Sequence, residues 1–173
     1  MKKIFITGMS GTGKSTLALE LKKRGFPVFD MDNMGANCNW TNIETGELSD
    51  YTHGVGKKWL YAHNWNCDLE KIKKAVMSCK DTDVVIVVGI IGNQRKLMSF
   101  FDQVFLLRLD NKTLKHRLTT RTTNDFASNE KDQEFIFEIK DKFEQEMIDL
   151  GATLLDGNLP TATIANQIID LVK

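Results

Sequence analysis

The sequence predicts a three-layer α/β fold in which a five-stranded parallel sheet carries helices on both faces. Five strand-length apolar segments alternate along the chain with segments of helical apolar periodicity. The segment 84–88 is apolar throughout, which is typical of a central parallel strand buried on both faces. The chain has 173 residues, enough for one domain over 1–173 with a substantial core.

The first unit is a strand at 4–6 followed by a helix whose inner face includes Leu17 and Leu21. Gly25 is a helix stop, because glycine adopts the left-handed conformation that ends many helices. A short second strand follows over 27–30.

Residues 33–66 interrupt this alternation, and a loop of that length in a compact domain is usually functional. A hairpin is predicted between 40–43 and 48–51. The segment also contains five large aromatic residues, namely Trp40, Tyr51, Trp59, Tyr61 and Trp65. Most of them are expected to pack the insert onto the core, and one or two could stack on a ligand.

The regular alternation resumes at Asp68, an expected helix N-cap. The remaining elements are a helix over 69–79, strands over 84–88, 103–109 and 152–155, a short helix over 96–101, a helix capped by Asp110 or Asn111, a long helix over 131–149 and a closing helix through Val172. Residues 122–129 are polar without periodicity and predict a mobile loop.

Charge and composition exclude several classes of protein. Lys plus Arg and Asp plus Glu both number 23, which argues against a nucleic-acid partner or a membrane surface. No apolar run approaches the roughly 20 residues of a membrane span, and glycines stand where a signal peptide would be apolar. Cys38, Cys67 and Cys79 show no metal-binding spacing, so reduced thiols and a cytoplasmic location are expected.

Between the first strand and the first helix, the sequence matches the phosphate-binding pattern G-x-x-x-x-G-K-[ST], known as the P-loop. Its glycines let several backbone N–H groups point at one anion, and the following helix adds its positive dipole end. Lys14 would contact β- and γ-phosphate oxygens of ATP, and the Ser15 hydroxyl would bind Mg²⁺. The predicted ATP-binding residues here are Gly8, Met9, Ser10, Gly11, Thr12, Gly13, Lys14, Ser15 and Thr16.

Other candidate residues follow the carboxyl ends of later strands, where ligands bind in such sheets. Asp30 and Asp32 follow the second strand, and one carboxylate could hold the metal while the other orients an acceptor. The alternative is a structural role in which both carboxylates cap a loop or a helix. The segment 89–95 has no carboxylate for a metal, which makes Asp30 the predicted metal residue together with Ser15.

Two further groups could contact substrates. Arg117 and Arg121 lie four residues apart, on one helical face before the polar loop, and could clamp a transferring phosphoryl group. A solvated basic helix end is the alternative. Asn93, Gln94 and Arg95 could bind an acceptor, although a helix cap and a solvated helix start explain them equally well.

With these motifs assembled, the chain resembles the P-loop small-molecule kinases, the group of adenylate, shikimate and dephospho-CoA kinases. The resemblance implies a P-loop NTPase fold with strand order 2-3-1-4-5, a substrate-binding insert over 33–66 and a lid over 117–130. It implies a metal role for Asp30, an acceptor-side role for Asp32, a catalytic role for both arginines and an ATP contact for Arg117. The turn containing Asp156 and Asn158 resembles the one that borders adenine.

The resemblance implies an ATP- and Mg²⁺-dependent kinase acting on a hydroxyl or phosphate of a small molecule, such as a nucleoside, a nucleotide or a cofactor precursor. A nucleotide-binding ATPase or switch without an acceptor is the alternative. A GTPase is disfavoured because Leu114 stands where the guanine motif Asn-Lys-x-Asp needs its aspartate. A monomer or a simple homodimer is expected.

Overall fold

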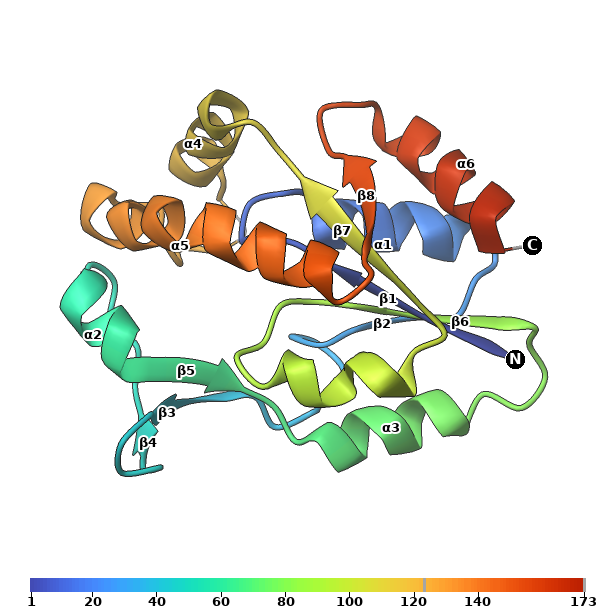
Figure 1. Ribbon diagram of the computed structural model, residues 1–173, viewed down its shortest axis with the longest axis horizontal. Coiled ribbons are helices and arrows are strands. Elements are labelled where there is room, and N and C mark those ends of the chain that lie inside the picture. The colour runs from blue at the N-terminus through green and yellow to red at the C-terminus, as the bar shows by residue number, and fades with distance from the viewer. Residues whose placement is uncertain (123, 173) are drawn as a thin grey trace.

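The computed structural model describes residues 1–122 and 124–172. A parallel sheet of five strands forms its centre, in the order β2-β6-β1-β7-β8, which is 2-3-1-4-5 when these strands are counted along the chain (Figure 1). The predicted fold and strand order are therefore confirmed. The strands are β1 (Lys2–Thr7), β2 (Val28–Asp30), β6 (Val84–Val88), β7 (Gln103–Arg108) and β8 (Thr153–Asp156).

Helices cover both faces of this sheet. One face packs on α1 (Lys14–Lys23) and α6 (Thr161–Val172), with Ile6, Leu21 and Ile168 fully buried between them. The other face packs on α3 (Leu69–Met77), the 3₁₀ helix η1 (Gln94–Phe100) and α5 (Glu130–Asp149). Successive residues of each strand point to opposite faces, so the apolar strands β1 and β6 contribute side chains to the hydrophobic cores on both faces of the sheet.

The helix α4 (Asn111–Thr120) packs with α5 at the carboxyl edge of the sheet. Asp110 caps it by accepting a hydrogen bond from the Thr113 backbone N–H at 2.9 Å, and Asp68 caps α3 in the same way. The carboxyl edge therefore carries the P-loop, the end of β2, the loop after β6 and the turn after β8.

The insert between β2 and α3 forms a second, antiparallel sheet in the order β4-β3-β5, at lower left in Figure 1. The predicted hairpin is confirmed as β3 (Asn39–Asn42) and β4 (Leu48–Ser49). Two elements were not predicted, the helix α2 (Lys57–Ala62) and the strand β5 (His63–Asn66), which pairs with β3 over its whole length. Trp40 lies opposite Trp65 in this pairing, so the two indole rings are neighbours in the insert.

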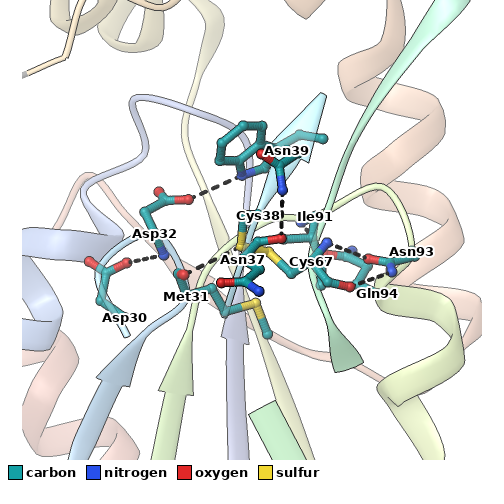
Figure 2. Close-up of a disulfide and its surroundings, with 11 residues drawn as sticks. Asp30, Met31, Asp32, Asn37, Cys38, Asn39, Cys67, Ile91, Asn93 and Gln94 are labelled. Carbon is teal, nitrogen blue, oxygen red and sulfur yellow. Dashed lines mark hydrogen bonds between the residues drawn. A yellow bond between two sulfur atoms is a disulfide. The ribbon is translucent and has the colours of Figure 1, made fainter. Parts of the chain in front are cut away.

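The expectation of three reduced thiols is wrong, because Cys38 and Cys67 form a disulfide (Figure 2). They stand immediately before β3 and after β5, next to the paired residues Asn39 and Asn66. The pairing of β3 with β5 brings the two thiols together, and their spacing of 29 residues in the sequence gives no sign of it. Cys79 remains a free thiol.

The segment predicted as a mobile polar loop, 122–129, is partly packed against the rest of the molecule. Ala127 is fully buried, and the Phe126 ring lies 5.7 Å from Trp40 and 5.4 Å from Tyr51. This part of the predicted lid 117–130 is thus packed on the insert, whereas Thr123 lies outside the described residues.

Within residues 1–122 and 124–172, no helix combines the length and the apolar character that crossing a membrane requires.

Candidate nucleotide and acceptor site

The P-loop wraps the carboxyl end of β1 in a conformation that its glycines permit. Gly8 has φ of 155°, and a Cβ there would lie 2.4 Å from the Leu107 carbonyl oxygen. Gly13 has φ of 100° at the start of α1, where side chains are rarely tolerated. The residues 8–13 therefore form a close backbone turn before a helix N-terminus, as phosphate binding requires.

Lys14 folds back over this loop. Its ammonium donates to the Gly8 carbonyl at 2.8 Å and to the Met9 carbonyl at 3.0 Å. Burial lowers the pKa of Lys14 to about 8, against the opposing effect of the charges of Asp32 and Asp30. Incoming phosphate oxygens would replace the two carbonyl partners and favour the charged ammonium.

Arg117 joins the P-loop to the turn after β8. Its guanidinium donates to the Thr12 carbonyl at 3.1 Å and to the Gly157 carbonyl at 3.3 Å. That turn is closed by the Asp156 carboxylate, which accepts hydrogen bonds from the backbone and side-chain amides of Asn158, both at 2.9 Å. Arg117 and the Asp156 turn thus lie on the same side of the phosphate loop.

Arg121 also reaches the P-loop, although not from a shared helical face as predicted. The helix α4 ends at Thr120, and Arg121 has an extended backbone. Its Nη1 donates to the Ser10 hydroxyl at 3.1 Å, while its buried Nε and Nη2 have no partner among the described residues. Buried cationic donors without acceptors are costly, so this guanidinium fits an anion beside Ser10.

Asp30 and Asp32 lie at the end of β2, where the chain has already turned. The backbone N–H of Asp32 donates to Oδ1 of Asp30 at 3.1 Å (Figure 2). The Trp65 indole N–H donates to Oδ1 of Asp32 at 3.2 Å. Partial burial, followed by the neighbouring charge of Asp30, raises the pKa of Asp32, which makes it a stronger base than an ordinary aspartate.

The three candidates after β6 separate in the structure. Asn93 uses its amide to bind the backbone of Cys67, donating at 2.8 Å and accepting at 3.3 Å, and it lies outside the cavity described next. Gln94 is buried and accepts from Thr7 at 3.2 Å. Arg95 borders the cavity and pairs with Glu146, Nε to Oε1, at 3.2 Å. Asn93 therefore serves the fold, and it does not enter the site proposed below.

A cavity of about 480 Å³ opens beside the P-loop, between the insert and α5. Met9, Ser10 and Asp32 lie at its phosphate-loop end. Its aromatic lining comes from three separate parts of the chain: Trp40, Tyr51 and Trp65 of the insert, Phe126 of the loop, and Phe135 and Phe143 of α5. A volume of this size is typical of sites for small organic molecules.

Asp132, which the sequence analysis did not single out, fixes one wall of this cavity. Its buried carboxylate accepts hydrogen bonds from the Tyr51 hydroxyl at 2.6 Å and from the backbone N–H groups of Gly54 at 3.1 Å and Gly56 at 2.8 Å. Burial by itself would raise the pKa of Asp132, but these hydrogen bonds and one from Asn129 lower it. Asp132 thereby attaches the segment 51–56 of the insert to α5. The sequence shows Asp132 only as an acidic residue in the first turn of a helix. Acidic residues are common at that position, so the pattern does not predict a contact with the insert.

Ser15 and Asp30 fit a magnesium ion as partial ligands. Mg²⁺ prefers oxygen donors and usually takes one or two protein groups together with phosphate oxygens and waters. The described residues contain no cluster of three His, Cys, Asp or Glu side chains that could hold a metal alone. The hydroxyl and the carboxylate at the phosphate loop suit an ion that arrives with a nucleotide.

The fold and the phosphate loop define a P-loop nucleotide-binding protein with the architecture of small-molecule kinases. The deoxyadenosine kinase from M. mycoides with bound dATP superposes with a TM-score of 0.60 at 18% identity, covering 99% of both chains. The shikimate kinase from Aquifex aeolicus superposes with a TM-score of 0.55 at 18% identity, covering 98% of this chain and 95% of that one. At such identities these likenesses show a shared fold.

The chain belongs to the AAA domain family, whose model matches residues 4–138. A curated relative is the nucleoside-triphosphatase THEP1 of Methanocaldococcus jannaschii. It is 27% identical over 164 residues, which span 84% of this chain and 95% of that protein.

Proposed function

We propose that this protein transfers the γ-phosphoryl group of ATP to a small-molecule acceptor held in the aromatic cavity. One observation carries the proposal: the cavity meets the P-loop at Met9 and Ser10, with Asp32 beside them. Hydrolysis of a nucleotide needs only water, so a cavity of about 480 Å³ at the phosphate end is better explained by an acceptor.

In the proposed reaction an acceptor hydroxyl lies next to Asp32. As the new bond forms between the acceptor oxygen and the γ-phosphorus, the bond from that phosphorus to the β-bridging oxygen breaks, and ADP leaves. Asp32 takes the hydroxyl proton, for which its raised pKa suits it. Lys14 and Arg121 offset the negative charge of the moving phosphoryl group, while Arg117 holds the P-loop against the Asp156 turn.

A bound Mg²⁺ would neutralise phosphate charge and hold the β- and γ-phosphates in a reactive arrangement. Ser15 and Asp30 are the residues proposed to hold it. Asp156 and Asn158 are proposed to border the nucleotide base, since Arg117 connects their turn to the phosphate loop.

A second candidate is a nucleoside triphosphatase that has no acceptor, which the likeness to the THEP1 protein favours. The two functions differ in the product, because a kinase forms a phosphorylated acceptor and a triphosphatase forms inorganic phosphate.

Two substitutions test the proposed roles. Asp32→Asn keeps the size of the side chain and should lower phosphoryl transfer by about 100-fold or more while ATP still binds. Lys14→Ala should weaken ATP binding itself by about 10- to 100-fold. Titration calorimetry with a non-hydrolysable ATP analogue and an assay of acceptor-dependent ADP release separate these effects. Unchanged transfer by Asp32→Asn would remove Asp32 from the mechanism.

A further inference from the structure

The cavity lining and its charges restrict the chemistry of the acceptor, and this inference rests on the proposed function. We propose that the acceptor is a hydroxyl compound with a flat aromatic or heteroaromatic ring and with no phosphate or carboxylate group.

The aromatic rings form one continuous surface. Trp40 lies 5.7 Å from both Trp65 and Phe126 and 6.0 Å from Tyr51, measured between ring centroids. Trp40 comes from β3, Trp65 from β5, Tyr51 from the segment 50–56 and Phe126 from the loop between α4 and α5. The tertiary fold therefore brings these rings together at the cavity. Ile90, Ile139 and Met147 add aliphatic surface. Such a wall favours a flat apolar ring that can stack or pack edge-on.

The charges of the cavity oppose an anion. Among the described lining residues, Asp32, Asp125 and Glu146 are acidic and Arg95 is basic, so three negative charges and one positive charge give a net −2. The single cation is already paired with Glu146 at 3.2 Å. A phosphate or carboxylate on the acceptor would therefore lose hydration in a cavity whose net charge repels it.

The opposite end of the site has the reverse character. Lys14, Arg117 and Arg121 all gather at the P-loop, where the phosphates of the donor would bind. The site therefore separates a cationic donor end from an acidic, aromatic acceptor end. Asp32 lies at the boundary, and its contact with the Trp65 indole holds the carboxylate at the edge of the ring surface. A ring-bearing alcohol would meet Asp32 with its hydroxyl while its ring packs on the wall.

The test compares matched pairs of compounds by titration calorimetry in the presence of a non-hydrolysable ATP analogue. The ring alcohols are adenosine, guanosine, cytidine, uridine and pyridoxine; each is paired with its own 5′-phosphate, and glycerol is the ringless control. At least one ring alcohol should bind about tenfold more tightly than its phosphate and than glycerol. Tighter binding of the phosphates, equal binding of glycerol, or no binding of any ring alcohol at millimolar concentration would overturn the inference.

Two variants test the physical reasons separately. Phe126→Ala removes a ring from a loop outside both sheets and should weaken the ring alcohol about tenfold. Phe100→Ala, which removes a half-buried ring away from the cavity, is the matched control and should have no such effect. Glu146→Gln releases Arg95 and should reduce the discrimination against phosphates. Equal effects of the two phenylalanine variants, or unchanged discrimination in Glu146→Gln, would contradict the argument.

The same panel separates the inference from the proposed function. Tight binding of a ring alcohol without any transfer would leave the preference of the cavity for such compounds standing and would refute the kinase. Transfer to a phosphorylated compound would support the proposed kinase and would overturn the inference about its acceptor.

Discussion

At the residue scale, Lys14 gives the site a defined pH dependence. Its pKa is lowered from the usual value of 10.5 to about 8, so the side chain is charged below that pH and neutral above it. Because phosphate oxygens bind the charged ammonium, ATP affinity should be full at pH 7 and should fall about tenfold by pH 9.

Calorimetric titration with the ATP analogue across this pH range measures the effect. Lys14→Arg is the matched control, because a guanidinium stays charged throughout and should remove most of the pH dependence. A wild-type affinity that is flat between pH 7 and 9 would show that Lys14 does not titrate there.

Asp132 should contribute substantially to the stability of the fold. Asp132→Ala would leave the Tyr51 hydroxyl and two backbone N–H groups without their buried acceptor, at a cost of about 3 kcal/mol in the free energy of unfolding. Urea denaturation measures this loss. Asp141→Ala on the same helix is the control, because the Asp141 side chain is 84% exposed. Equal effects of the two variants would refute the role of Asp132 as an attachment point.

At the scale of elements, the disulfide stabilises the insert that carries the aromatic surface. It closes a loop of about 30 residues between Cys38 and Cys67, for which the chain-entropy model gives about 3–4 kcal/mol. Cys38→Ser should therefore lower the midpoint of thermal unfolding, and a phosphine reductant should affect the wild type in the same way.

Cys79→Ser is the control for this experiment, since Cys79 is a free thiol that follows α3 and packs against the core on that face of the sheet. Reduction should also change the fluorescence of Trp40 and Trp65, which lie on the strands that follow Cys38 and precede Cys67. An unfolding midpoint unaffected by the reductant would contradict the stabilising role.

Some of these elements are predictable from the sequence and others are not. The strand at 84–88, the helix stop at Gly25 and the cap at Asp68 were predictable because each depends on a local pattern. The strand β5 was not, because His63-Asn64-Trp65-Asn66 has little apolar alternation and becomes a strand only by pairing with β3. The disulfide depends on that pairing and was missed with it.

The candidate site divides in the same way. The P-loop was predictable in full, since its chemistry lies in one contiguous motif. Arg121 was predicted to clamp the phosphoryl group from a helical face, and it does contact Ser10 of the P-loop, but its extended backbone could not be foreseen from helical spacing. The cavity is formed by side chains from the insert, the loop and α5, and Asp132 fixes their arrangement across 81 residues of sequence. Such contacts leave no periodic pattern.

At the scale of the whole molecule, the fold places two unlike surfaces at one edge of a parallel sheet. The P-loop, α4 and the turn after β8 supply cations and backbone donors for a nucleotide. The insert and α5 supply an aromatic cavity with acidic groups. We propose that a phosphoryl group moves from the first surface to a compound bound on the second.

The most direct measurement incubates the protein with Mg²⁺, γ-³²P-labelled ATP and a small-molecule cell extract, and follows where the label goes. Most of the label should enter an acid-stable organic phosphate, and ADP release should depend on the extract. Asp32→Asn should abolish both effects. Label that appears only as inorganic phosphate, at the same rate with and without extract, would contradict phosphoryl transfer to an acceptor and would establish the nucleoside triphosphatase instead.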